Sequence, residues 1–294
     1  MPVQSALVTG CSVGGIGAAL ALALAKRGVH VFATARNTSK ISQELSNLSN
    51  VTVLQLDVLS ASSVADAAKL VGDSGHGLDV LINNAGAGYA QPVLDIDIDK
   101  AQRVYDVNVW GPIRTIQAFA SHLIARRGRI VNISTVGSIV NTPWISAYSS
   151  SKAAMTNISE TLRLELSPFG VDVVTVMAGV VTSNFHANDI NFDLPLNSGY
   201  APIKSIIATW ASGDAKPKGC SAEEFAEILV ANVLDNGKSS GLVWRGPYAA
   251  SLKFMTGWLP RFLMDKFMSQ GQGLKELFDV VNAGKSGGDG TSDP

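Results

Sequence analysis

The stretch Ser-Ala-Leu-Val-Thr-Gly-Cys-Ser-Val-Gly-Gly-Ile-Gly, residues 5–17, decides the fold. It opens with the apolar run 5–8, which is typical of a buried strand, and it ends where an Ala/Leu-rich helical pattern begins at Gly17. Glycines between a strand and a helix permit a tight turn and let the backbone approach a pyrophosphate, which the helix N-terminus then binds. A glycine-rich turn alone is a weak signal, but this context favours a dinucleotide-binding site over a purely structural turn.

Short β-branched runs alternate with longer helical patterns along the rest of the chain. Strands are predicted at 29–34, 51–56, 78–82, 129–133, 171–176 and 241–244, and helices at 17–27, 39–48, 61–71, 98–126, 147–167 and 222–234. This alternation is typical of βαβ units, in which helices cover both faces of a parallel sheet. The predicted fold class is therefore α/β, a Rossmann-like doubly wound parallel sheet in a single domain with a C-terminal helical extension.

The chain is expected to divide into one catalytic domain and a C-terminal extension. Residues 1–248 form the dinucleotide-binding domain, with an Asn-, Pro- and Gly-rich substrate loop at 183–220, because loops this long are usually functional. Residues 249–270 form an apolar helical extension interrupted at Pro260, and 271–294 a largely disordered tail. The extension closes over the substrate cleft, packs on a second subunit, or lies as an amphipathic segment on a membrane or lipid droplet.

Composition and charge exclude several classes of protein. The net charge is −1 with a pI near 6.4, so no global field attracts nucleic acid or an anionic membrane. No signal peptide is predicted, and the longest apolar run, 16–25, is shorter than the roughly 20 residues that span a bilayer. Cys11 and Cys220 lie in no paired motif, which favours a reducing, cytoplasmic location. The four histidines lack metal-ligand spacing, so no metal site is predicted, and His186 is expected to line the substrate pocket.

The end of the second predicted strand indicates which nicotinamide cofactor binds. An NAD site places an acidic residue there, about 20 residues after the glycines, to hold the ribose 2′-hydroxyl. Residues 31–40 contain no Asp or Glu but do contain Arg36, with Ser12 in the glycine loop and Lys40 nearby. An arginine suits a 2′-phosphate through charge-assisted hydrogen bonds, so NADP(H) is predicted. The alternative is that Arg36 only caps a surface helix.

Tyr148 and Lys152 form the second chemical signal. Positions i and i+4 of a helix lie on one face, so the two side chains can converge. A free tyrosine titrates near 10, and an ammonium close by favours the phenolate and lowers that pKa toward the range useful for proton exchange. Such a pair also occurs often by chance on a helix surface.

Further residues complete a resemblance to a known family, the short-chain dehydrogenases/reductases, from residue 4 to about 245. Besides the glycine loop and the Tyr148/Lys152 pair, it depends on Asp57, Asn83-Asn84-Ala85-Gly86, Asn108 and the segment 178–183, in this order and spacing. The resemblance implies a sheet of seven strands and an enzyme that moves a hydride to or from a nicotinamide cofactor.

The resemblance also implies a role for each matching position. On the cofactor side, Gly10, Ser12, Gly15, Ile16 and Gly17 surround the pyrophosphate, Arg36 meets the ribose phosphate, Asp57 holds the adenine, Asn84 and Gly86 flank the ribose, and Val181 and Ser183 lie at the nicotinamide. On the catalytic side, Tyr148 is the general acid, Lys152 binds the nicotinamide ribose and tunes the tyrosine, Asn108 holds a water in a proton relay to Lys152, and Thr135 orients the substrate.

The chain departs from the family pattern at four places. The glycine loop is one residue longer than the common form, Ala178 stands for a proline, and Ser183 for a threonine. Thr135 occupies the position of the substrate-orienting serine, and its added methyl group tightens the pocket while the hydroxyl is kept. Ser134 and Ser138 are the alternatives if the alignment of this segment shifts.

Within the family, the chain looks most like fungal NADPH-dependent 1-acyldihydroxyacetone phosphate reductases and related hydroxysteroid dehydrogenases. This resemblance depends on the lengthened glycine loop and on the segments Ala33-Thr34-Ala35-Arg36 and Val243-Trp244-Arg245-Gly246, and many reductases of fungal secondary metabolism look the same at these positions. The expected function is reduction of a hydrophobic ketone to a secondary alcohol, with Tyr148 as proton donor. Alternatives are alcohol oxidation and a catalytically silent NADP-binding scaffold. A homodimer or homotetramer is expected, with no nucleic acid partner and no transmembrane segment.

Overall fold

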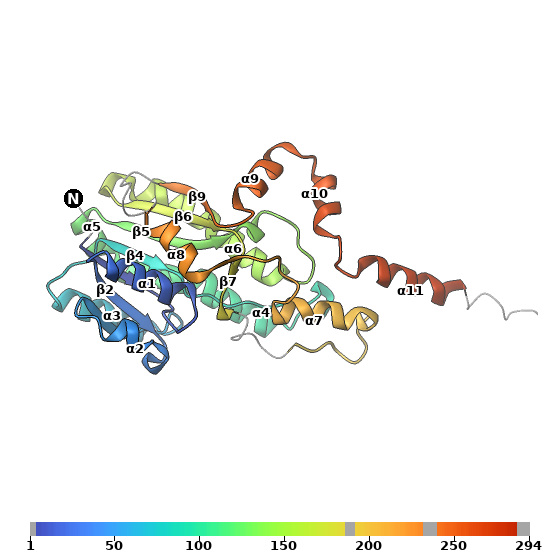
Figure 1. The fold of residues 1–294 in the computed structure, drawn as a ribbon, viewed down its shortest axis with the longest axis horizontal. Coiled ribbons are helices and arrows are strands. Elements are labelled where there is room, and N and C mark those ends of the chain that lie inside the picture. The colour runs from blue at the N-terminus through green and yellow to red at the C-terminus, as the bar shows by residue number, and fades with distance from the viewer. Residues whose placement is uncertain (1–3, 186–191, 232–239, 287–294) are drawn as a thin grey trace, which may run out of the picture.

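Seven parallel strands form the central sheet of the computed structural model, which describes residues 4–185, 192–231 and 240–286 (Figure 1). The strands, in their order across the sheet, are β3 (Val51–Gln55), β2 (His30–Ala35), β1 (Ser5–Val8), β4 (Val80–Asn83), β5 (Arg129–Thr135), β6 (Asp172–Ala178) and β9 (Gly241–Arg245). Every neighbouring pair is parallel. The predicted fold class, a doubly wound α/β sheet of about seven strands, is confirmed.

Helices cover both faces of this sheet. One face is covered by α1 (Ile16–Lys26), α2 (Gln43–Ser46) and α8 (Ala222–Val230), and the other by α3 (Ala61–Asp73), α5 (Gly111–Arg126) and α6 (Ser146–Leu166). A further helix, α4 (Ile98–Tyr105), leads into α5 and packs beside α6. The result is a three-layer arrangement with a hydrophobic core on each side of the sheet.

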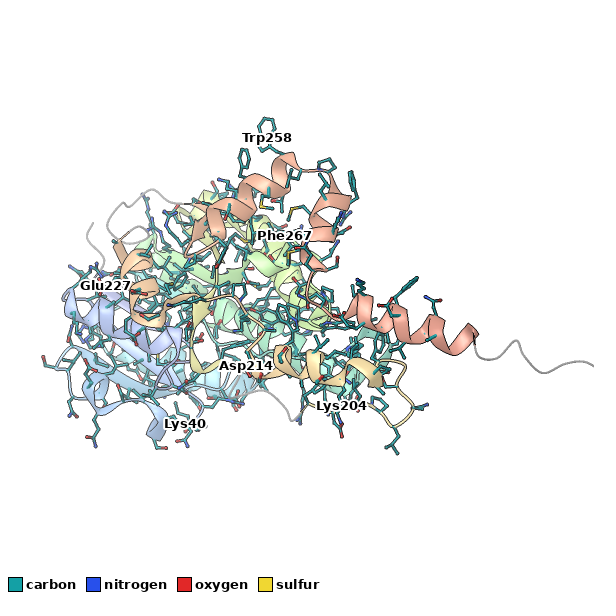
Figure 2. All side chains as sticks on the ribbon, turned by 45° about the vertical axis from the view of Figure 1, so that its right-hand side comes forward. Lys40, Lys204, Asp214, Glu227, Trp258 and Phe267 are labelled. Carbon is teal, nitrogen blue, oxygen red and sulfur yellow. The ribbon has the colours of Figure 1, made fainter. Side chains whose placement is uncertain are left out.

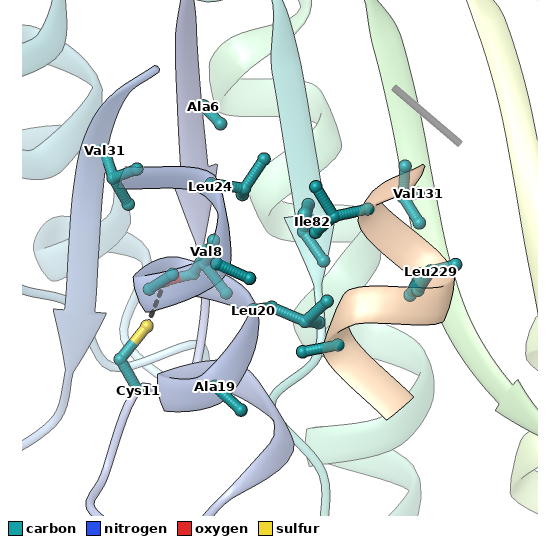
Figure 3. Close-up of a cluster of buried hydrophobic side chains, with 14 of the residues drawn as sticks. Ala6, Val8, Cys11, Ala19, Leu20, Leu24, Val31, Ile82, Val131 and Leu229 are labelled. Carbon is teal, nitrogen blue, oxygen red and sulfur yellow. Dashed lines mark hydrogen bonds between the residues drawn. The ribbon is translucent and has the colours of Figure 1, made fainter. Parts of the chain in front are cut away.

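Strand β1 shows why the sheet is apolar on both faces. Ala6 and Val8 lie in the core beneath α1 and α8, whereas Leu7 lies in the core beneath α3 and α5, and all three are fully buried. Figure 3 shows Ala6 and Val8 in the same cluster as Leu20 of α1 and Leu229 of α8. Since successive side chains of a strand point to opposite faces, a strand covered on both sides reads as a continuous apolar run.

The strand order reverses between β1 and β4, which places a crevice at the carboxyl ends of these strands. From β1 the chain continues outward to β2 and β3, and β4 begins the other half with β5 and β6. Ligands of doubly wound sheets bind outside the carboxyl ends of the strands at such a switch point. The glycine loop 9–17, residues 84–87, Thr135 and residues 179–183 all follow or end strands at this edge.

Three segments differ from what the sequence predicts. The expected loop 183–220 contains helix α7 (Lys204–Ser212). A short parallel strand pair joins the two ends of this loop, with β7 (Val181–Thr182) directly before it and β8 (Cys220–Ser221) where it ends. The expected single helix 98–126 is divided by a π-helical turn, Asp106–Trp110.

The predicted disordered tail is wrong over Leu274–Ser286, which forms helix α11. Leu277 of this helix packs against the hydrophobic cluster formed by Trp144, Leu194, Ile203 and Ile207. Leu277 is half-buried and the other described side chains of the helix are exposed, so this single contact with a distant part of the chain is what the sequence pattern does not reveal. His186 and residues 287–294, for which a pocket wall and a disordered tail are predicted, lie outside the described residues.

The C-terminal helices α9 (Ala249–Trp258), α10 (Arg261–Met268) and α11 form an arm that stands away from the sheet (Figure 1). Pro260 separates α9 from α10. Large apolar side chains of the arm are exposed, among them Trp258 and Phe267, which Figure 2 labels. The arm is tied to the domain where Trp144 Nε1 donates to the Gln272 carbonyl oxygen at 3.1 Å. Within the described ranges, no helix combines the length and apolarity that crossing a bilayer requires.

Candidate active site

The glycine loop connects β1 to α1 in a conformation that needs glycine. Gly10 has a φ of +77°, which L-residues with a side chain rarely adopt. At Gly17, an added Cβ would lie 2.5 Å from the Gly10 carbonyl oxygen and would collide with the Asn84 amide nitrogen. The loop therefore lies close against the start of α1 and the end of β4, with no space for side chains at these two positions.

The N-terminus of α1 is open for an anion. Gly15 is the N-cap residue and offers no side chain to accept from the first-turn amides, and Ile16 begins the helix. Asn84 clamps the loop from the side of β4, since its Nδ2 donates to the Thr9 carbonyl oxygen at 2.9 Å and to the Gly10 carbonyl oxygen at 3.3 Å. A bare helix N-terminus beside a rigid glycine turn fits the pyrophosphate of a dinucleotide.

The residues expected at the adenosine end surround the same edge of the sheet. Arg36 follows β2 and is exposed, and Ser12 is half-buried in the loop. Lys40 contributes a backbone contact, because its carbonyl oxygen accepts from the Val13 amide at 2.9 Å. Asp57 follows β3 and caps a turn, in which its Oδ1 accepts from the Leu59 amide at 3.0 Å.

Thr135 and Tyr148 face each other across the carboxyl end of β5. The Thr135 side chain lies close enough to the Tyr148 phenol to lower its pKa, and the Thr135 hydroxyl accepts from the Gly137 amide at 3.1 Å. The two alternatives to Thr135 are engaged elsewhere: Ser134 lies 2.7 Å from the Thr156 hydroxyl, and Ser138 donates to the Thr135 carbonyl oxygen at 2.7 Å. Of the three hydroxyls, Thr135 is the one placed beside the phenol.

The pKa of Tyr148 differs from the sequence-based expectation. Burial raises the pKa of its phenol to about 12, and the hydrogen bond with Thr135 lowers it only in part. The expected lowering by Lys152 is wrong for this structure, because desolvation of the phenolate outweighs every favourable contact.

Lys152 lies one helical turn after Tyr148 on the same face of α6. Its ammonium is buried and donates to the Ile133 carbonyl oxygen at 2.9 Å. Burial lowers the pKa of Lys152 to about 8, because the charged form loses its hydration. Gly86 lies directly opposite, where an added Cβ would be 3.6 Å from the Lys152 Nζ.

Asn108 is positioned by the π-helical turn between α4 and α5. The Gly111 amide bonds to the carbonyl oxygen of Asp106, five residues earlier, and Pro112 has no amide hydrogen to continue the α-helical pattern. The side-chain amide of Asn108 is fully buried, donates to the Ala87 carbonyl oxygen and the Ser151 hydroxyl at 2.9 Å each, and accepts from the Ala87 amide at 2.9 Å. Asn108 thus fixes the segment after β4 to helix α6.

The segment after β6 closes the site from the remaining side. Val181 is buried in β7 and Ser183 is half-buried directly after it. Asn184 contacts the glycine loop, since its backbone amide donates to the Gly14 carbonyl oxygen at 3.0 Å. The Phe185 ring packs against Tyr148, with centroids 5.7 Å apart.

Three of these residues are missed by sequence reasoning. Phe185, Asn184 and Ser151 carry no motif, and the spacing that reveals Tyr148 and Lys152 gives no signal for a contact across a loop. Ser151 could have been noticed, because a serine three residues after Tyr148 on a helix faces inward beside Lys152.

Comparisons with known proteins find a family model and relatives that match most of the chain. The model of the short chain dehydrogenase family matches residues 4–192. Short-chain dehydrogenase ptmH of Penicillium ochrochloron is 44% identical over 266 residues, which cover 90% of this chain and 96% of the relative. The NADPH-dependent 1-acyldihydroxyacetone phosphate reductase of Schizosaccharomyces pombe is 38% identical over 239 residues, 79% of each protein.

Solved structures show the same fold. A short chain dehydrogenase from Burkholderia cenocepacia in complex with NADP superimposes with a TM-score of 0.72 at 26% identity, covering 89% of this chain and 96% of that one. A short-chain dehydrogenase from Streptomyces avermitilis gives a TM-score of 0.73 at 27% identity, covering 96% and 98%.

Proposed function

The chain belongs to the short-chain dehydrogenase family, and from this premise we propose that it reduces a ketone to a secondary alcohol with NADPH. Membership makes the chain an oxidoreductase that uses a nicotinamide cofactor; the direction, the phosphate-bearing form of the cofactor and the residue roles are proposed. The observation that carries the proposal is the placement of Thr135 beside the Tyr148 phenol, one helical turn from the buried Lys152.

The residues of the glycine loop and of β7 would hold the cofactor. The cofactor would lie in a cradle that side chains at the loop glycines would fill, formed by Gly10, Ser12, Gly15, Ile16 and Gly17. Asn84 and Gly86 border this cradle. Its two ends are marked by Asp57 on one side and by Val181 and Ser183 on the other. When bound there, the nicotinamide supplies the hydride. The NADP complex of the Burkholderia protein and the NADPH dependence in the name of the Schizosaccharomyces relative support NADP(H).

Proton transfer would fall to Tyr148. Thr135 lies beside Tyr148, so a substrate carbonyl oxygen placed between the two hydroxyls would accept from both. With a pKa of about 12, Tyr148 keeps its proton at neutral pH and acts as an acid once negative charge develops on that oxygen. The charge on Lys152 would stabilise the phenolate that remains, and Asn108 holds the surrounding backbone in place.

Several finer proposals follow from the relatives and the contacts near Tyr148. Phe185 and the cluster around Trp144 suit a hydrophobic ketone, such as a lipid-like or polyketide-like molecule. Similarity to fungal short-chain dehydrogenases supports a role in secondary metabolism, and similarity to the acyldihydroxyacetone phosphate reductase supports a lipid precursor. We also propose a homo-oligomer in the cytoplasm, with the exposed arm at a subunit contact or against a lipid surface.

Cofactor choice gives a first test. Replacing the exposed Arg36 by aspartate removes the cation proposed to bind the 2′-phosphate and adds a repelling charge. Since a hydrogen bond to a charged group contributes about 1.5–3 kcal/mol, the dissociation constant of NADPH should rise roughly 10- to 100-fold while that of NADH changes little. Fluorescence titration of both cofactors measures this. Wild-type enzyme binding NADH as tightly as NADPH would contradict the assignment.

Thr135 gives a second test. Thr135→Val keeps the shape and removes the hydroxyl, so kcat should fall about 10²-fold, as for loss of one donor to a developing oxyanion, with NADPH affinity unchanged. Thr135→Ser should stay active. Ser138→Ala is the matched control, because its hydroxyl is occupied by the Thr135 carbonyl oxygen. Loss of turnover in Ser138→Ala with full turnover in Thr135→Val would show that the wrong hydroxyl is assigned.

A further inference from the structure

Lys216 is a half-buried cation that forms no ion pair with the carboxylates of the described residues. Lys100 and Lys204 form ion pairs with Asp97 and Asp193, and the buried Lys152 donates to a carbonyl oxygen. Lys216, in the turn between α7 and β8, has no ion pair with any residue that the structure describes. Burial lowers its pKa, with no opposing contact.

The position of Lys216 relates it to the proposed proton donor. Its Nζ lies 6.0 Å from the centroid of the Phe185 ring, at the outer limit of a cation–π contact. The Phe185 ring packs in turn on Tyr148, with centroids 5.7 Å apart. The Phe185 ring therefore contacts both Lys216 and the Tyr148 phenol, on the side of the site formed by the residues that follow β7.

The backbone holds Lys216 in this place. Helix α7 ends at Gly213, whose φ of +89° turns the chain back. The Ala215 amide donates to the Thr209 carbonyl oxygen at 2.9 Å, and the Lys216 amide donates to the Gly213 carbonyl oxygen at 3.2 Å. Figure 2 labels Asp214, two residues before Lys216, in this same turn. Asp214 forms no ion pair with Lys216, and its carboxylate accepts from the Ser212 hydroxyl.

Burying a cation without a partner costs free energy, which is recovered when an anion arrives in the same partly desolvated place. The contact with Phe185 is long and neutralises no charge. The arrangement is thus poised to bind a negative group beside the reacting centre.

We propose that Lys216 binds an anionic group of the substrate, a carboxylate or a phosphate, on the part of the ketone that extends past Phe185. This inference rests on the proposed function and narrows its substrate class to ketones that combine an apolar body with a negative charge. Lys216 is then a residue that determines specificity and leaves the chemical step to Tyr148.

The experiment compares rigid ketones that differ only in charge. 4-Acetylbenzoate and 4′-acetylbiphenyl-4-carboxylate are each paired with their methyl esters, so that two distances between carbonyl and charge are sampled. Wild type, Lys216→Met, Lys216→Arg and Lys218→Met are compared. Lys218 is the matched control because it is an exposed lysine two residues away. The kcat and KM values with NADPH are measured, as are dissociation constants of acid and ester for the enzyme loaded with NADP⁺.

The wild type should favour an acid over its ester in at least one pair. Lys216→Met should raise the KM and dissociation constant of that acid tenfold or more, with kcat and the values for the ester unchanged. Lys216→Arg should retain the preference, and Lys218→Met should match the wild type. High salt should weaken the preference in the wild type and leave Lys216→Met unaffected.

Three results would overturn the inference. The first is equal affinity of wild type and Lys216→Met for the acids. The second is an equal loss of affinity for acid and ester in Lys216→Met, which would indicate that the side chain only packs. The third is a rise in the NADPH dissociation constant in place of that of the acid, which would assign the cation to the cofactor's phosphates. Failure of the proposed function looks different: no ketone oxidises NADPH. Calorimetry of the acids still decides the anion site in that case, since selective loss of binding in Lys216→Met needs no turnover.

Discussion

Replacing Tyr148 by phenylalanine should lower ketone turnover by roughly 10²–10⁴-fold, the usual effect of losing a general acid. The change removes the hydroxyl that lies beside Thr135 and keeps the ring that packs on Phe185. NADPH should therefore bind with its normal dissociation constant. Stopped-flow absorbance of NADPH measures turnover, and fluorescence titration measures binding.

A structural explanation of the same loss can be excluded by folding measurements. Tyr148→Phe should unfold near the wild-type temperature, because the buried ring surface is unchanged and only the hydroxyl group is removed. A variant that reduces ketones at the wild-type rate would end the assignment of Tyr148 as proton donor and leave only a cofactor-binding fold.

Lys152→Met should lower turnover by a similar factor and also weaken cofactor binding. The substitution removes a buried ammonium that donates to the Ile133 carbonyl oxygen and that faces Gly86 at the proposed ribose site. We expect kcat to fall roughly 10²-fold or more and the NADPH dissociation constant to rise about tenfold. The combined loss distinguishes Lys152 from Tyr148, whose substitution affects turnover alone. Normal cofactor affinity in Lys152→Met would contradict the ribose contact.

The pH profile separates the two residues further. The pKa of Lys152 is lowered to about 8, so its charge is present below pH 8 and is lost as the pH rises through that value. Ketone reduction should fall over the same range, whereas the Tyr148 phenol, with a pKa of about 12, stays protonated throughout. Lys152→Arg keeps its charge at high pH and should remove the inflection. An inflection near pH 8 that persists in Lys152→Arg would assign it to another group.

Much of the fold follows from local sequence, because the determinants are local. The apolar strand 5–8, the glycines and the start of the helix after them lie within thirteen residues, and each strand of a doubly covered sheet is apolar along its length. The same reasoning fails at the π-helical turn before Pro112 and at α11. The first depends on hydrogen-bond geometry around a proline, and the second on a docking partner far away in the chain.

Some residues of the candidate site can likewise be predicted from the sequence, and others cannot. Tyr148, Lys152 and Asn108 belong to a recognisable spacing, and the structure gathers them at one edge of the sheet. The direction of the tyrosine pKa could not be predicted, because it depends on how deeply the phenol is buried and not on which residues adjoin it in sequence. The contacts of Phe185 with Tyr148 and Lys216 join segments that sequence alone cannot pair.

Transfer of a deuterium label tests the central claim most directly. Wild-type enzyme would be incubated with 4-acetylbenzoate or its methyl ester and with NADPH deuterated at C4 of the nicotinamide, prepared separately as each C4 epimer, and the product would be analysed by mass spectrometry. We predict one deuterium on the carbinol carbon of the alcohol from one epimer, no label from the other, and loss of product formation in Tyr148→Phe. An unlabelled alcohol from both epimers, or no alcohol from either ketone, would contradict the proposed reduction.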